Sequence, residues 1–129
     1  MTELTTEQIA AIANNKDQFT RAYAECALWS SSDDDGTPLD EGRDYSDIAP
    51  ATLAEMLEDC TQFRRDNAEL LSGLDEGQSG HDFWLTRNRH GAGFWDRGLG
   101  EVGTKLTDAA HAWGSYDLYV GDDDLVYGQ

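Results

Sequence analysis

The segment 80–98 constrains the fold more than any other stretch of the chain. It reads Gly-His-Asp-Phe-Trp-Leu-Thr-Arg-Asn-Arg-His-Gly-Ala-Gly-Phe-Trp-Asp-Arg-Gly, and it holds two of the four Trp, two of the four Phe and two of the three His. The rest of the sequence is acidic and mostly helical in pattern. An aromatic and relatively basic segment within such a chain is either the rigid centre of the fold or its working surface.

The pattern within this segment predicts a β-hairpin over 82–97. Residues 82–87 alternate in the period of two that is typical of a strand. The Asn and Gly content of 88–93 suits a hairpin loop, and a second strand is expected to resume at 94–95. The strand register, which the sequence leaves open, decides which aromatic side chains face outward among Phe83, Trp84, Phe94 and Trp95.

The other segments predict three helical stretches and a second hairpin. A capping box formed by Thr5 and Gln8 marks the start of the first helix. The expected elements are a helix or split helix over 1–29, an acidic loop over 30–47, a helix over 48–74, a helix over 100–113 and a hairpin over 116–127. We therefore expect one α+β domain spanning 1–129, in which N-terminal helices pack on a small antiparallel sheet of two hairpins with a helix between them.

Net charge is the outlying property of the composition. The chain of 129 residues has 26 acidic against 9 basic side chains, which gives a formal net charge of −17 and a pI near 4.1. Such a charge keeps a protein soluble, repels nucleic acid and anionic membranes, and steers the protein towards basic partners. Simple solubility, or adaptation to high salt, is the plainer explanation.

The N-terminal sequence and the cysteine content point to the cytoplasm. The chain begins Met-Thr-Glu-Leu-Thr-Thr-Glu, without the basic start and apolar run of a signal peptide. No apolar stretch approaches the roughly 20 residues that span a bilayer. We therefore expect no membrane partner. Cys26 and Cys60 are too few for a disulfide framework and lie on apolar helix faces, so we expect both thiols to be reduced and buried.

Residue spacing supports neither a metal site nor a catalytic one. The acidic run 33–36 resembles a calcium loop, but Gly42 stands where the EF-hand pattern needs a bidentate carboxylate. The three histidines have no zinc-ligand spacing with one another or with a cysteine. No oriented nucleophile is recognisable. We therefore expect a non-enzymatic protein with no metal, cofactor or catalytic residue.

Several strings in the sequence resemble a family of small acidic proteins carried by bacteriophages, prophages and plasmids. They are Ala-Glu-Cys-Ala-Leu-Trp at 24–29, Asp-Ile-Ala-Pro at 47–50, Gly-His-Asp-Phe-Trp-Leu-Thr-Arg-Asn at 80–88, His-Gly-Ala-Gly-Phe-Trp-Asp at 90–96 and Asp-Leu-Tyr-Val-Gly-Asp-Asp at 117–123. This resemblance implies a mobile-element origin and action in a bacterial cytoplasm. It supplies no catalytic residues. By analogy with other small acidic phage proteins, it suggests an inhibitor of host defence, such as an anti-CRISPR or anti-restriction protein.

The leading hypothesis is a DNA mimic that occupies the basic groove of a host nucleic-acid-binding protein and does not itself bind nucleic acid. The expected contact residues are acidic: Asp33, Asp34, Asp35, Asp40, Glu41, Glu55, Glu58, Asp59 and Asp66. An alternative is a protein-recognition module that uses the predicted hairpin through Trp84, Arg87, Arg89, His90 and Trp95. A third possibility is a small anion-binding enzyme that uses His81, His90, Arg87, Arg89 and Arg97.

Overall fold

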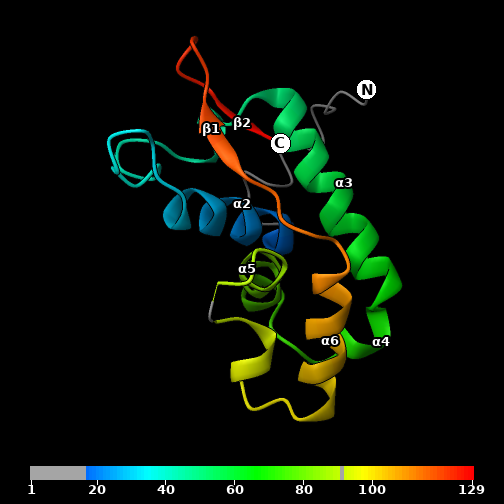
Figure 1. Cartoon of the computed structure of the whole chain (residues 1–129). Helices are drawn as coiled ribbons and strands as arrows, with labels where there is room; N and C mark the ends of the chain where they lie inside the picture. Colours follow the sequence, from blue (N-terminus) through cyan, green and yellow to red (C-terminus); the bar gives the residue numbers. More distant parts are fainter. Residues whose placement is uncertain (1–16, 91) are drawn as a thin grey trace.

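The computed structural model of the chain describes residues 17–90 and 92–129, which form helices and one small sheet (Figure 1). The helices are α2 (Gln18–Ser30), α3 (Pro50–Asp66), α4 (Ala68–Leu71), α5 (Glu76–Arg87) and α6 (Glu101–His111), with 3-10 turns η1 (Tyr45–Asp47) and η2 (Phe94–Asp96) and strands β1 (Leu118–Val120) and β2 (Val126–Gly128). The described chain is therefore α+β, with a single pair of strands in its sheet. The capping box at Thr5 lies outside the described residues, as does the part of the first predicted helix before residue 17.

Side-chain hydrogen bonds explain where α2 begins and α3 ends. The Asp17 carboxylate accepts a hydrogen bond of 3.0 Å from the N–H of Thr20 and caps α2. At the other helix, the backbone N–H and the side-chain amide of Asn67 both donate to the carbonyl of Phe63, at 3.1 and 2.9 Å. Asn67 thereby competes with the helical ladder, and the helix predicted over 48–74 is divided into α3 and α4.

The hairpin predicted over 82–97 is wrong, because residues Glu76–Arg87 form α5 and Phe94–Asp96 form η2. The Asp75 carboxylate caps α5 by accepting a hydrogen bond of 2.8 Å from the N–H of Gln78. All six residues from 82 to 87 are at most 5% exposed. A helix buried on every side loses the one-sided apolar pattern that marks an amphipathic helix. Residues 82–87 therefore show a mixture of polar and apolar side chains, and their alternation, which is accidental, resembles the pattern of a strand.

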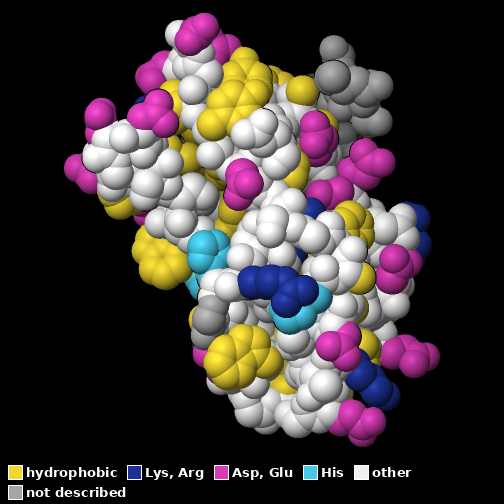
Figure 2. All heavy atoms as spheres, viewed as in Figure 1, with side chains coloured by type: hydrophobic (Ala, Val, Ile, Leu, Met, Phe, Trp, Pro, Cys, Tyr) yellow, Lys and Arg dark blue, Asp and Glu magenta, His cyan; other side chains and the backbone are white. Residues whose placement is uncertain are grey.

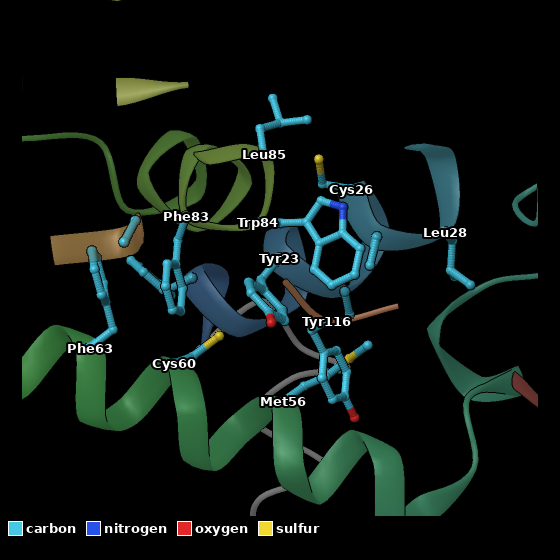
Figure 3. Packing of buried hydrophobic residues seen from close by; sticks show 14 of the residues in the cluster. Tyr23, Cys26, Leu28, Met56, Cys60, Phe63, Phe83, Trp84, Leu85 and Tyr116 are labelled. Atoms are coloured by element: carbon cyan, nitrogen blue, oxygen red, sulfur yellow. The ribbon is translucent and has the colours of Figure 1, made fainter. Parts of the chain in front are cut away.

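The core is built around the aromatic side chains of α5 (Figure 3). Phe83 stacks on Phe63 of α3 with ring centroids 4.0 Å apart, and it contacts Tyr23 of α2 at 5.3 Å. Trp84 meets Tyr23 edge to face and donates a hydrogen bond of 2.7 Å from Nε1 to the hydroxyl of Ser30. These contacts join α2, α3 and α5 into one cluster.

The C-terminal hairpin is attached to the start of α3. Strands β1 and β2 pair antiparallel, with Tyr119 opposite Tyr127. This hairpin overlaps the one predicted over 116–127, and β2 ends one residue later, at Gly128. On its other side, β2 forms a parallel bridge from Val126 to Ile48, and the N–H of Ala49 donates to the Val126 carbonyl at 2.8 Å. Helix α6 lies within the predicted stretch 100–113.

Length and polarity rule out a membrane-spanning role for each helix in the described ranges 17–90 and 92–129.

Gly80 sets the distance between α5 and α2. A Cβ atom built on Gly80 would overlap the backbone of Phe19, with the Phe19 carbonyl carbon only 2.8 Å away. Backbone atoms cannot turn aside as a flexible side chain can, so the two helices approach this closely only with glycine at this position.

We therefore predict that Gly80→Ala lowers the free energy of unfolding by about 1–3 kcal/mol, the usual cost of overpacking. Gly77→Ala is the matched control on the same helix, because its Cβ would meet only the Asp75 carboxylate at 3.5 Å. The control should be neutral or stabilising by up to about 1 kcal/mol. Urea unfolding of both variants measures the difference, and equal stabilities would contradict the close packing.

Candidate functional site

Two of the residues expected on a partner-binding hairpin lie in the interior instead. Trp84 is 2% exposed and Arg87 is 5% exposed, both on α5. Neither side chain reaches the surface, so the prediction that they contact a partner is wrong for Trp84 and Arg87. The other three residues predicted for this binding set, Arg89, His90 and Trp95, follow the helix. Arg89 and His90 are exposed, and Trp95 is 58% exposed.

The Arg87 guanidinium is fully engaged by groups from three other parts of the fold. It donates to the Tyr23 hydroxyl of α2 and to the Asp59 carboxylate of α3, each at 3.0 Å. It also donates to the carbonyl of Gly114 at 2.8 Å and to that of Trp113 at 3.5 Å, just beyond α6. Burial raises the pKa of Asp59, although the hydrogen bond and charge of Arg87 act in the opposite direction. Arg87 is thus a structural cation.

A second ion pair, between a buried carboxylate and an exposed guanidinium, fastens the segment after α5. Asp82 is 2% exposed and accepts hydrogen bonds from both Nε and Nη2 of Arg97, the shorter at 2.8 Å. The pKa of Arg97 is raised by this hydrogen bond. Thr86 accepts a hydrogen bond of 3.2 Å from the N–H of Phe94, which holds η2 against α5. The cations Arg87 and Arg97 are therefore both committed to the fold.

Arg89 and His90 share a surface pocket of about 280 Å³ with Trp95 and with His111 of α6. His111 was not among the predicted site residues, and only the packing of α6 beside η2 places it here. His81, in contrast, lies against Trp29 with ring centroids 6.0 Å apart, and burial lowers its pKa. The set proposed for an anion-binding enzyme is therefore not brought together.

Arg89 holds a backbone conformation that usually belongs to glycine. Its φ is +56°, its N–H donates to the Thr86 carbonyl at 3.0 Å, and the N–H of His90 donates to the Leu85 carbonyl at 3.0 Å. This pair of bonds is a Schellman motif, in which glycine is favoured at the left-handed position. Within residues 17–90 and 92–129, the Arg89 guanidinium has no hydrogen-bond or ion-pair partner. No contact in the described chain explains an arginine at this position.

Residues 31–44 of the acidic loop and the turn of the hairpin (121–125) meet in what we call the acidic end of the molecule. Arg43 of the loop pairs with Asp124 of the turn at 3.2 Å. The carboxylate of Asp33 accepts from the N–H of Asp35 at 2.9 Å and of Thr37 at 3.0 Å, so it shapes the loop. Of the predicted contact residues in this loop, those that are exposed are Asp34, Asp35, Asp40 and Glu41.

Acidic side chains are concentrated over this end of the face shown in Figure 2. The turn adds three further exposed carboxylates that were not among the predicted contact residues: Asp122, Asp123 and Asp124. Tyr119, which is 45% exposed, stacks on Tyr127 beside them. The sequence shows these three carboxylates as a run of Asp residues. That the run lies near the acidic loop depends on the tertiary fold and cannot be predicted from the local sequence.

The remaining predicted acidic residues lie along α3 and differ in availability. Glu58 is exposed, and Asp66 accepts a hydrogen bond of 2.8 Å from Gln62 while remaining exposed. Glu55 accepts a hydrogen bond of 3.2 Å from the Tyr116 hydroxyl. Asp59 is half-buried and is paired with Arg87, so it is not available as a partner contact.

Neither cysteine has the properties of a nucleophile. Burial raises the pKa of Cys26 to about 12 and that of Cys60 well above its usual range, which keeps both thiols protonated. In the part of the chain that the structure describes, no three His, Cys, Asp or Glu side chains converge as metal ligands would.

Comparison with known protein families, with curated proteins and with solved structures finds no match for this chain.

Proposed function

We propose that the chain is a non-enzymatic, phage-type inhibitor that binds the basic, nucleic-acid-handling surface of a bacterial defence or DNA-metabolism protein. The observation that supports this most is the acidic end, where two segments about 80 residues apart in sequence are linked by the Arg43–Asp124 pair at 3.2 Å. The exposed carboxylates there greatly outnumber the nearby cations. An anti-CRISPR or anti-restriction role is the form of inhibition that the family resemblance favours.

Two of the arginines are engaged by carboxylates outside the acidic end. Arg87 is buried and pairs with Asp59, and the exposed Arg97 pairs with the buried Asp82, so both guanidinium groups are engaged outside the acidic end. Duplex DNA presents one negative charge per roughly 1.7 Å of axis to the proteins that bind it. An acidic surface competes for the same lysines and arginines, and its electrostatic attraction acts before contact.

Charge reversal at the acidic end should weaken competition with DNA. We predict that Asp34→Lys combined with Asp35→Lys reduces displacement of labelled duplex DNA from a susceptible DNA-handling protein by about tenfold at low salt, equivalent to about 1.4 kcal/mol. Neither side chain has a hydrogen bond within the described chain, so the fold should tolerate the changes. Fluorescence anisotropy with a panel of purified bacterial nucleases and effector complexes measures the displacement.

The matched control is Glu69→Lys combined with Asp108→Lys, which changes the net charge equally on α4 and α6, away from the acidic end (Figure 1). This pair should retain most of the activity. Equal losses in both double variants would show that only total charge matters, and no displacement by the unmodified protein would contradict the proposal itself.

A second candidate function is recognition of one specific protein through the pocket of Arg89, His90, Trp95 and His111. Arg89 favours it, because an exposed arginine keeps a strained left-handed backbone without a partner in the described chain. Arg and Trp are also the residue types most enriched at the energetic centres of protein interfaces.

Arg89→Gly separates stability from binding at this pocket. Glycine suits the left-handed position, so we predict that the variant is as stable as the parent or more stable by about 1 kcal/mol. If the pocket contacts the target, the same variant loses inhibitory activity. The control is Arg65→Ala, which removes an exposed charge on α3 with little structural effect. Full activity of Arg89→Gly would argue against the pocket.

A further inference from the structure

The outer edge of strand β1 is unpaired in the described chain. Asp117 and Gln129 exchange both backbone hydrogen bonds, at 3.0 and 2.9 Å, and the N–H of Gly121 donates to the Leu125 carbonyl at 2.8 Å. In an antiparallel ladder such bonded positions alternate with positions whose N–H and C=O point away from the partner strand. Leu118 and Val120 occupy the outward positions, and within residues 17–90 and 92–129 their outward groups have no partner.

A groove runs along this free edge. One hollow of about 460 Å³ lies between residues 118–120 of β1 and the start of the acidic loop. A second hollow of about 380 Å³ continues it past the end of α2 and the chain before β1. Ser32 and Leu118 line both hollows, so the two adjoin along this edge. The groove therefore offers space beside a row of unused backbone hydrogen-bonding groups.

Carboxylates line the groove, and most of them lie at the first hollow. Asp33, Asp34 and Asp35 line it on the loop side, and Asp117 lines it at the end nearer α5. Two basic residues line the groove in the described chain: Arg43, whose guanidinium is engaged by Asp124, and His90 at the second hollow. An extended segment entering the groove would bring its side chains against carboxylates.

We propose that β1 binds an extended, basic polypeptide segment of the partner as a third strand of the sheet. The backbone of the segment pairs with the outward N–H and C=O groups of Leu118 and Val120, and its Lys or Arg side chains reach Asp34 and Asp35. Strand addition of this kind takes affinity from main-chain hydrogen bonds and specificity from side chains. The basic character of the segment rests on the proposed function, whereas the strand geometry does not.

A second copy of this chain is the other occupant that a free strand edge could accept, and charge disfavours it. Each chain has a formal net charge of −17, and pairing two β1 edges would bring two acidic loops together. Acidic residues beside a strand edge are a common protection against self-association. The same residues attract a basic strand.

The test uses the isotope-labelled full chain and a synthetic peptide, acetyl-Lys-Val-Lys-Val-Lys-Val-amide, at low salt. Two control peptides have the same charge but carry backbone N-methyl groups on every Lys or on every Val. Because alternate residues of a strand face its neighbour, one of the two methylated peptides should lose binding by about tenfold or more. Amide exchange at Leu118 and Val120 should slow in the complex, whereas Tyr119, bonded to β2, should change little.

Three other outcomes would overturn the proposal in distinguishable ways. Equal binding of all three peptides, without protection at Leu118 and Val120, would leave the charge attraction intact but exclude strand addition. Failure of every peptide to bind at low salt would count against both strand addition and the acidic-surface function. Protection of the β1 edge without peptide, increasing with protein concentration, would identify a second copy as the occupant.

Discussion

The fold depends on one buried cation, the guanidinium of Arg87. A buried charge is strongly destabilising unless hydrogen bonds and an opposite charge compensate it. Here the compensation comes from Tyr23 of α2, Asp59 of α3 and two carbonyl groups beyond α6, so four parts of the chain must be in place together. The guanidinium also lies within 6 Å of the ring centroids of Phe83, Trp113 and Tyr116. Because all these contacts converge on a side chain of α5, this helix lies at the centre of the fold.

Commitment of α5 to the interior determines where function can lie. Trp84 and Arg87, which look like recognition residues in the sequence, are used within the core, and the pair Asp82–Arg97 fastens the following segment. The surface features on which the proposals rest are the acidic end, with the free edge of β1, and the small pocket around Arg89. A negatively charged groove beside an open strand is suited to a basic, extended partner.

The sequence was sufficient to predict the fold class and the outer helices, but it did not predict the central helix α5. Amphipathic patterning located α6, and it located α3 apart from the break at Asn67, because each shows one apolar face to the core. It failed at 82–87, where complete burial removes the polar face that distinguishes a helix from a strand. The carboxylates of the acidic loop were visible in the sequence. Their meeting with the 122–124 turn, and the arrival of His111 beside Arg89, depend on tertiary packing that no local pattern records.

A double-mutant cycle between Arg87 and Asp59 tests this account most directly. We expect Arg87→Met alone to lower the free energy of unfolding by about 3 kcal/mol or more, because it leaves a partly buried carboxylate without its counter-charge. Adding Asp59→Asn should recover part of that loss, so the double variant should be more stable than the sum of the single changes predicts. Additive effects, or a cost for Arg87→Met below about 0.5 kcal/mol as at an ordinary surface site, would contradict a central role for this cation.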